Sequence, residues 1–262
     1  MADKFHEQIE IKQGAWIFTS ATLAVSGDFK HFTERLGLKP KQQFSLPSPF
    51  DYEQQARLCV PRYLPEPNSP GLADKLVRML ASVIEENDGR CFFLCTSHSM
   101  MRELGERFRE VLDLPVLMQG EMSKQKTLAE FMELGNALLV ATGAFWEGID
   151  VRGDALSCVI IDKLPFTAPD DPLLKARIED CRLRGGEPFA EVQIPDAVIT
   201  LKQGVGRLIR DQKDHGALII CDNRLVTRDY GGIFLASLPP IPRTRDLERI
   251  KTFLKAEQDS QS

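Results

Sequence analysis

Residues 136–164, NALLVATGAFWEGIDVRGDALSCVIIDKL, contain two apolar runs separated by a segment rich in glycine and acidic residues. The runs at 136–142 and 156–164 are nearly all apolar instead of alternating, which is typical of strands covered by helices on both faces. Small residues and glycines after such a strand form the usual ligand crevice of an open α/β sheet. Residues 141–153 therefore predict a ligand site, with an ordinary strand-to-helix turn as the alternative.

Similar runs recur along the chain and are separated by amphipathic segments. We expect strands at 15–20, 56–60, 91–97, 115–119, 136–142, 156–164 and 216–222. We expect helices at 72–87, 98–112 and 123–133, and a shorter one at 171–184 within an insertion that spans 165–200. Strand–helix–strand alternation with short links predicts an α/β fold with a right-handed parallel sheet flanked by helices.

The composition is that of an ordinary globular protein, with 43% hydrophobic and 27% charged residues. No apolar run reaches the roughly 18 residues that cross a bilayer, and the polar N-terminus lacks the apolar stretch of a signal peptide, so we expect a cytoplasmic protein. The net charge of −5 confines any binding of nucleic acid to a local patch. The six cysteines lack metal-ligand spacing and are expected to lie in the core, so we predict no metal site.

The stretch QGVGRLIR at 203–210 lies in a helical pattern and carries two arginines. Gln203, Arg207 and Arg210 are spaced i, i+4 and i+7, so a continuous helix would place them on one face. Two guanidinium groups on one face suit a triphosphate. Gly204 and Gly206 disfavour a helix by about 1 kcal/mol each, which predicts a close approach of the backbone to another group. A solvated basic helix is the alternative.

Two further stretches place hydroxyl groups after apolar runs. TSATL at 19–23 follows AWIF, and CTS at 95–97 ends the run CFFLCTS. Serine and threonine at such positions commonly cap helices, and they also contact phosphates. The sequence leaves both roles open.

Taken together, TSATL, FFLCTS, ATGAFWEGIDVRG and QGVGRLIR resemble helicase motifs III, IV, V and VI in order and approximate spacing. SPFDYEQQARLCVP and VIIDKLPFTAPDDP resemble the XPD/DinG branch of superfamily 2 helicases. The resemblance extends from about residue 15 to residue 254 and implies a RecA-like fold. It divides the chain into a remnant of a first motor domain at 1–25, a helicase C-terminal motor domain at 26–256 and a disordered tail at 257–262.

The resemblance also implies an ATP site shared between two motor domains. Arg207 and Arg210 would be arginine fingers that reach the γ-phosphate, with Gln203 assisting. Nucleotide contacts and coupling to DNA would involve Glu147, Gly148, Asp150 and Gly206. The sequence contains no G-x-x-x-x-G-K-[ST] and no DEAH-type acidic box. We therefore expect the nucleotide cradle, the Mg²⁺ ligands and the family's 4Fe-4S cluster to lie in an upstream portion, and this chain alone to be inactive as an ATPase.

For nucleic acid, the resemblance implies 5′-to-3′ movement along single-stranded DNA in repair or replication. Thr96, Ser97 and Thr142 would contact the backbone of the strand, and residues 20–22 would relay between the two motor domains. An RNA-directed helicase of the same superfamily is an alternative.

The segment PPIPRTRDLERIKTFLKA, 239–256, places Leu247, Ile250 and Leu254 at helical spacing. This pattern predicts a final helix packed on the domain or, alternatively, a docking element. A resemblance to one bacterial DinG paralogue implies that its partner is the chi subunit of the DNA polymerase III clamp loader, bound through Arg243, Thr244 and Arg245. A partner-binding module is thus a second hypothesis for the function.

Overall fold

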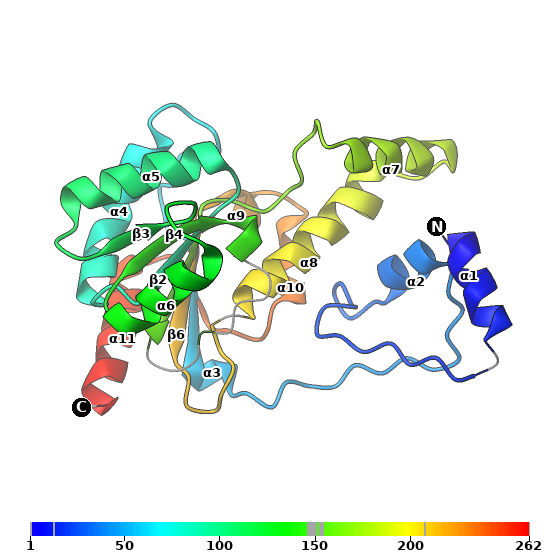
Figure 1. Ribbon diagram of the computed structural model, residues 1–262, viewed down its shortest axis with the longest axis horizontal. Coiled ribbons are helices and arrows are strands. Elements are labelled where there is room, and N and C mark those ends of the chain that lie inside the picture. Colours follow the sequence, from blue (N-terminus) through cyan, green and yellow to red (C-terminus); the bar gives the residue numbers. More distant parts are fainter. Residues whose placement is uncertain (1, 13, 146–150, 152–154, 207, 262) are drawn as a thin grey trace.

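The computed structural model describes residues 2–12, 14–145, 151, 155–206 and 208–261 (Figure 1). Within these residues, seven strands form one sheet in the order β3-β4-β2-β5-β6-β1-β7, and all strand pairs are parallel. The strands are β1 (Ala56–Cys59), β2 (Cys91–Cys95), β3 (Val116–Met118), β4 (Leu138–Thr142), β5 (Cys158–Ile161), β6 (Gly216–Ile220) and β7 (Arg243–Thr244). Six of them coincide with predicted apolar runs, which confirms the parallel α/β architecture.

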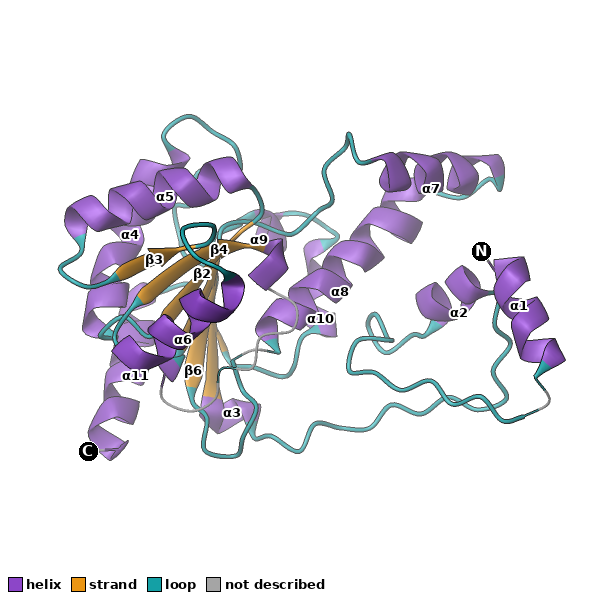
Figure 2. Cartoon of the chain, in the orientation of Figure 1, coloured by secondary structure: helices purple, strands orange, loops and turns teal. Residues whose placement is uncertain are grey.

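Helices cover both faces of this sheet (Figure 2). The longer ones are α4 (Leu72–Glu86), α5 (His98–Val111), α6 (Lys124–Leu134), α7 (Pro172–Leu183), α8 (Ile194–Val205) and α11 (Leu247–Gln261); the shorter ones are α1 (Ala2–Ile11), α2 (Lys30–Leu36), α3 (Tyr52–Gln55), α9 (Arg224–Thr227) and α10 (Gly231–Ser237). Helices α4, α5 and α11 pack together on one face, and α6, α8 and α10 lie on the other, as right-handed crossovers in this strand order require.

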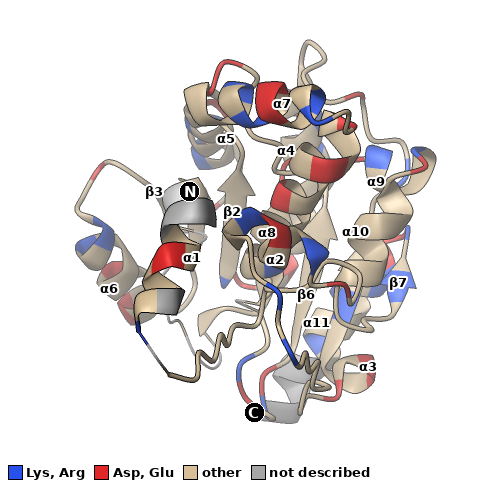
Figure 3. Cartoon of the chain, turned by 90° about the vertical axis from the view of Figure 1, so that its right-hand side faces the viewer, with Lys and Arg blue, Asp and Glu red and all other residues tan. Residues whose placement is uncertain are grey.

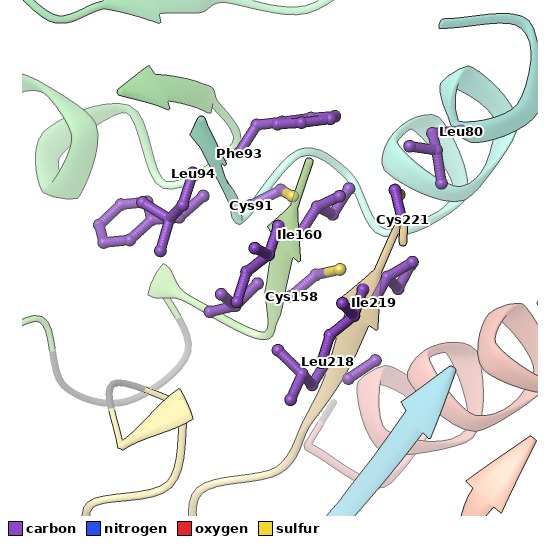
Figure 4. Close-up of a cluster of buried hydrophobic side chains, with 14 of the residues drawn as sticks. Leu80, Cys91, Phe93, Leu94, Cys158, Ile160, Leu218, Ile219 and Cys221 are labelled. Carbon is purple, nitrogen blue, oxygen red and sulfur yellow. The ribbon is translucent and has the colours of Figure 1, made fainter. Parts of the chain in front are cut away.

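The central strands are buried along their whole length because both faces are covered. Leu94 on β2, Ile160 on β5 and Ile219 on β6 are at most 1% exposed and belong to the buried hydrophobic core (Figure 4). All six cysteines are buried, so the prediction that they belong to the core is confirmed. Their burial in apolar surroundings raises the pKa of the Cys91, Cys95 and Cys221 thiols well above the ordinary value, which keeps them neutral.

Local sequence signals set the ends of several helices. Ser97, Ser123 and Asp171 each accept a hydrogen bond from a backbone N–H of the first turn of α5, α6 and α7. Gly135 ends α6 in the left-handed conformation that glycine adopts without strain. Gly89, also left-handed, has the carbonyl of Asn136 so close that a Cβ would lie 2.5 Å from its oxygen.

The insertion between β5 and α8 projects from the domain (Figure 1). It contains α7, a turn at Gly185, and a short π-helical segment (Phe189–Gln193) that continues directly into α8. Helix α7 matches the predicted helix at 171–184 within one residue at each end. The insertion is fixed to the domain partly by Arg177 on α7, which forms an ion pair with Asp196 on α8.

The predicted strand at 15–20 is wrong, since residues 15–20 have no regular structure. Trp16 is 40% exposed and Ile17 is 84% exposed. A strand needs a neighbour for its backbone N–H and C=O groups, and the described residues pair no strand with this run. The apolar run AWIF therefore neither pairs within this sheet nor lies buried, since three of its four residues are exposed.

Two helix ends also differ from the predictions. Helix α8 ends at Val205, with Gly206 as its C-cap, instead of continuing through Arg210. The flexibility of Gly204 and Gly206, which disfavours helix, accounts for the early end. Helix α11 continues through Gln261, whereas we expected disorder at 257–262; the alanine, glutamate and glutamine of its last turns are good helix formers.

The segment that precedes the domain is anchored on α8 and α10. The Lys202 ammonium on α8 donates to the Ala24 carbonyl at 2.9 Å, and the Ser26 amide donates to the Ser237 hydroxyl at 2.9 Å. The His31 ring contacts the Asp196 carboxylate at 3.1 Å. In the described part of the chain, no helix is both long and apolar enough to span a bilayer.

Candidate functional site

The carboxyl ends of β2 and β4 bring the predicted DNA contacts together. In the parallel register Cys95, the last residue of β2, pairs with Thr142, the last residue of β4. Thr96 and Ser97 follow Cys95 directly, so three hydroxyl groups lie at one edge of the sheet. The sequence placed each of them at the end of an apolar run, and the parallel pairing explains why they meet.

These three hydroxyls differ in how they are held. The Thr142 hydroxyl and amide both donate to Oε1 of Gln119, at 3.0 and 2.7 Å, and Thr142 is only 6% exposed. The Ser97 hydroxyl oxygen instead accepts from the Met100 amide at 3.2 Å as the N-cap of α5. The cap uses an oxygen lone pair and leaves the hydroxyl hydrogen for another acceptor. Capping and phosphate contact are therefore compatible at Ser97.

Thr96 is held by Asp162, the residue that follows β5. Asp162 is 1% exposed, and its carboxylate accepts from the Thr96 amide at 3.0 Å, the Thr96 hydroxyl at 3.1 Å and the Lys163 amide at 2.8 Å. Burial raises the pKa of the Asp162 carboxyl to about 7, although Lys163 and these hydrogen bonds act in the opposite direction.

A second buried carboxylate fixes the next residue of the KLPF segment, 163–166. Asp222, which follows Cys221 after β6, accepts from the Leu164 amide at 2.8 Å. It also pairs with the Arg224 guanidinium, at 2.6 Å from Nη2 to Oδ2 and 2.9 Å from Nε to Oδ1. The hydrogen bond to Asp222 raises the pKa of Arg224, despite the opposing effect of burial. The guanidinium carbon lies 5.5 Å from the centroid of the Phe166 ring.

Phe166 connects this edge to the insertion. Its ring stacks on Phe189 with centroids 5.7 Å apart and contacts Tyr230 and Phe234 edge-on at 6.0 and 5.8 Å. Aromatic pairs at these separations add packing energy beyond area burial. The KLPF segment is thus held on both its backbone and its aromatic side chain.

Most of the predicted nucleotide site cannot be placed, because Arg207, Glu147, Gly148 and Asp150 lie outside the described residues. Gln203 is half-buried on α8, and exposed Gly206 follows the end of that helix. Arg210 lies beyond the end of the helix, so Gln203 and Arg210 do not share one helical face.

The turn that carries Arg210 is nevertheless well defined. Its amide and that of Asp211 both donate to the Asp214 carboxylate at 2.8 Å. The buried Gln55 side chain donates to the carbonyls of Asp211 and Asp214 at 2.9 Å. Leu208 and Ile209, which directly precede Arg210, are at most 4% exposed and pack in the core.

The predicted partner residues lie in and directly after β7, the outermost strand on one side of the sheet (Figure 3). Arg245 is engaged within the domain, with Nε at 2.6 Å from the Val60 carbonyl and Nη2 at 3.3 Å from that of Pro61. Arg243 is exposed and donates to the Leu235 carbonyl at 2.9 Å. Beside β7 is a pocket of about 310 Å³. Its lining comprises Leu58, Val60, Arg62, Val226, Leu235, Arg243, Thr244, Arg245, Asp246 and Arg249.

Sequence reasoning missed Asp162, Asp222, Gln119 and the strand β7. A signal for the first two was present, because the apolar runs VIID and IICD each end in an aspartate at the carboxyl end of a strand. Among the described residues, no group of three or more His, Cys, Asp or Glu side chains could hold a metal ion.

Known proteins resemble this chain over nearly its whole length. It is 67% identical to the ATP-dependent DNA helicase YoaA of Escherichia coli over 97% of its residues, and 63% identical to YoaA of Haemophilus influenzae over 97%. It is 36% identical to the ATP-dependent helicase DinG of Mycobacterium tuberculosis over 91%. The chain spans 40% of the length of each YoaA relative and 37% of that DinG.

Solved structures share the fold at low sequence identity. S. tokodaii Xpd4 matches 92% of this chain with 47% of its own, at a TM-score of 0.60 and 14% identity. A structure titled XPD_APO matches 73% of this chain with 40% of its own, at a TM-score of 0.57 and 19% identity. These likenesses support the RecA-like helicase fold alone. Residues 80–241, more than half of the sequence, match the helicase C-terminal domain family, so this chain belongs to that family.

Proposed function

We propose that this chain is the second motor domain of an ATP-dependent DNA helicase of the XPD/DinG group that acts in repair or replication in the cytoplasm. The observation that carries the proposal is the meeting of Thr96, Ser97 and Thr142 at one edge of a RecA-like sheet, where the Ser97 hydroxyl keeps its hydrogen for an acceptor. Hydroxyl groups at such an edge contact phosphates without reading sequence, as a motor that moves along a strand requires. The high identity to two YoaA helicases supports DNA as the substrate.

In this proposal the chain supplies one half of the nucleotide site. Arg207 and Arg210 reach the γ-phosphate of ATP, with Gln203, Gly206, Glu147, Gly148 and Asp150 around the nucleotide. A first motor domain elsewhere in the polypeptide supplies the phosphate cradle, the Mg²⁺ ligands and a 4Fe-4S cluster. When bound, ATP with Mg²⁺ provides the phosphoryl group whose hydrolysis drives 5′-to-3′ movement. The arginines stabilise charge on that group only if the two motor domains close on it.

The binding half of the proposal is tested by fluorescence anisotropy with a labelled oligothymidylate. We expect Ser97→Ala to weaken binding by about tenfold through the loss of one charge-assisted hydrogen bond, and Ser97→Thr, which keeps donor and cap, to restore it. Ser99→Ala, which changes an exposed serine at the second position of α5, is the matched control. Equal affinity of Ser97→Ala and the parent chain would contradict this DNA track. Tighter binding to oligouridylate RNA would favour the RNA-directed alternative.

The catalytic half is tested in the polypeptide that joins this chain to the nucleotide cradle. We expect Arg207→Ala and Arg210→Ala each to reduce DNA-stimulated ATP hydrolysis on the order of 10³-fold or more, with single-strand binding retained. Arg102→Ala, an exposed arginine on α5, should leave turnover unchanged. The chain alone should show no turnover, and turnover comparable to that of the joined polypeptide would overturn the division of the site.

A second candidate function is the docking of the helicase on the chi subunit of the DNA polymerase III clamp loader. It is favoured by β7, an edge strand beside a pocket whose lining includes four aliphatic side chains and four arginines. We propose that Arg243 contacts the partner directly, with Thr244 beside it. Arg245 acts through the placement of β7, because its guanidinium is engaged by Val60 and Pro61.

This assignment predicts different behaviour for the two arginines. In calorimetry, Arg243→Ala should lower the affinity for chi without changing the melting temperature of the chain. Arg245→Ala should lower both the affinity and the melting temperature. Arg102→Ala again serves as control. Unchanged affinity for chi in the Arg243, Thr244 and Arg245 triple alanine variant would remove this function.

A further inference from the structure

The two oxygens of the buried Asp162 carboxylate have different partners. Oδ1 accepts two backbone amides, from Thr96 at 3.0 Å and from Lys163 at 2.8 Å. Oδ2 accepts the Thr96 hydroxyl at 3.1 Å. Oδ1 thus holds the main chain at the ends of β2 and β5, and Oδ2 controls a single side-chain hydrogen.

This arrangement limits what Thr96 can do toward nucleic acid. A threonine hydroxyl has one hydrogen, and phosphate oxygens are acceptors only. While Thr96 donates to ionised Asp162, it cannot donate to a phosphate. Ser97, whose hydroxyl oxygen accepts from Met100, has no such restriction.

We propose that Asp162 is a positioning residue for single-strand binding, because Thr96 can donate to a phosphate only when Oδ2 carries a proton and donates to the Thr96 oxygen. The inference rests on the proposed role of Thr96 in the DNA track. Protonation at Oδ2 reverses one hydrogen bond and leaves both backbone amides on Oδ1. The contact changes while the strand ends keep their places.

The surroundings make this protonation accessible near neutral pH. Burial raises the pKa of Asp162 to about 7, with Lys163 acting in the opposite direction. Cys95, at the end of β2, and Cys221, after β6, also face this carboxylate. Burial raises the pKa of both thiols well above the usual value, so neither changes charge between pH 6 and 8. Asp162 is therefore the group in hydrogen-bond contact with the Thr96 hydroxyl whose charge changes in this range.

The substitution Asp162→Asn reproduces the protonated arrangement. The amide oxygen replaces Oδ1 as acceptor of both backbone amides, and the amide nitrogen replaces Oδ2 and donates to Thr96. We expect Thr96→Val to cost about tenfold in oligothymidylate affinity at about pH 8.5 when residue 162 is asparagine, and less than about twofold when it is aspartate. Comparing Thr96→Val in both backgrounds cancels the effect of removing a negative charge near the DNA.

The pH profile is an independent measurement that needs no change at residue 162. The cost of Thr96→Val in the otherwise unchanged chain should grow to about tenfold as the pH falls to about 6, and Asp162→Asn should abolish this growth. Circular dichroism melts verify folding of each variant; if Asp162→Asn does not fold, the profile alone decides.

The outcomes separate this inference from the proposed function. A large cost of Thr96→Val that is equal in both backgrounds and constant with pH would overturn the role of Asp162 and leave Thr96 as a DNA contact. No cost in either background at any pH would overturn the DNA contact of Thr96 and this inference together.

Discussion

Replacement of Asp222 by alanine tests how the KLPF segment is fixed at the sheet edge. Asp222 is fully buried and accepts from the Leu164 amide, the Arg224 amide and the Arg224 guanidinium. Arg224 has a side chain only 25% exposed. The substitution therefore leaves a buried main-chain N–H and a mostly buried guanidinium without their acceptor.

The magnitude follows from those two losses. Removal of one partner of a buried ion pair costs about 3–5 kcal/mol, largely because the remaining charge is left uncompensated. An unpaired buried N–H alone costs about 1–3 kcal/mol. Because the two costs share one environment, they do not add fully, and we expect about 3–5 kcal/mol for Asp222→Ala. For a domain of this size that corresponds to a decrease in the melting temperature of roughly 10 °C.

Urea unfolding followed by circular dichroism measures this free energy, and amide hydrogen exchange at Leu164 shows whether the segment itself loosens. A double variant with Arg224→Met removes the uncompensated cation and should recover part of the stability. A loss below about 1 kcal/mol, or a double variant whose loss equals the sum of the single losses, would refute the reasoning.

Three further outcomes follow from the contacts. Burial raises the pKa of Asp162 from 3.8 to about 7, so between these pH values the folded state keeps a proton that the unfolded state loses. The free energy of unfolding should therefore fall by at most about 4 kcal/mol as the pH rises from 4 to 7. In urea unfolding, Asp162→Asn should not show this decrease. Gly89→Ala should lower the melting temperature more than Gly135→Ala, because both glycines have positive φ but only at residue 89 would the new Cβ also meet a carbonyl. Equal decreases in melting temperature would contradict this. His31→Ala should increase limited proteolysis between residues 12 and 45 without changing the domain's melting temperature, because it removes one anchor on Asp196; an unchanged cleavage rate would count against that anchor.

The order of the elements was predictable because burial on both faces of a parallel sheet requires apolar runs. The runs at β2, β4, β5 and β6 satisfy that requirement fully, and their sequences show it. The strand β7 was not predictable from composition, since Arg243 and Thr244 carry no apolar pattern and pair with Leu58 and Cys59 only at the edge of the sheet. Trp16 and Ile17 show the converse error, apolar residues without a partner strand.

The candidate site was predictable to the level of strand ends. The strand ends carrying Thr96, Ser97 and Thr142 were predicted from apolar runs, and their nucleic-acid role from the resemblance to helicase motifs; parallel register brings such ends together. The acceptor of each threonine hydroxyl was not predictable from the sequence. Thr142 donates to Gln119, which lies 23 residues earlier, and Thr96 donates to Asp162, which lies 66 residues later. The helical spacing of Gln203 and Arg210 failed for a local reason, since Gly206 ends α8 between them.

The two missed aspartates join the insertion and the sheet edge that carries Thr96 in one set of contacts. Phe189 of the insertion stacks on Phe166, and the main chain just before Phe166 is held by Asp222 through Leu164. The residue before Leu164 donates its amide to the same Asp162 oxygen that holds the Thr96 amide. If the insertion moves and carries Phe166 with it, the hydrogen bonds of both Asp222 and Asp162 must therefore be strained. Asp162 is the carboxylate that fixes Thr96. In a parallel sheet, buried acids at strand ends are costly unless every oxygen is satisfied. Here they are satisfied by the ends of β2 and β5, the KLPF segment and Arg224, so one set of hydrogen bonds holds both the base of the insertion and Thr96.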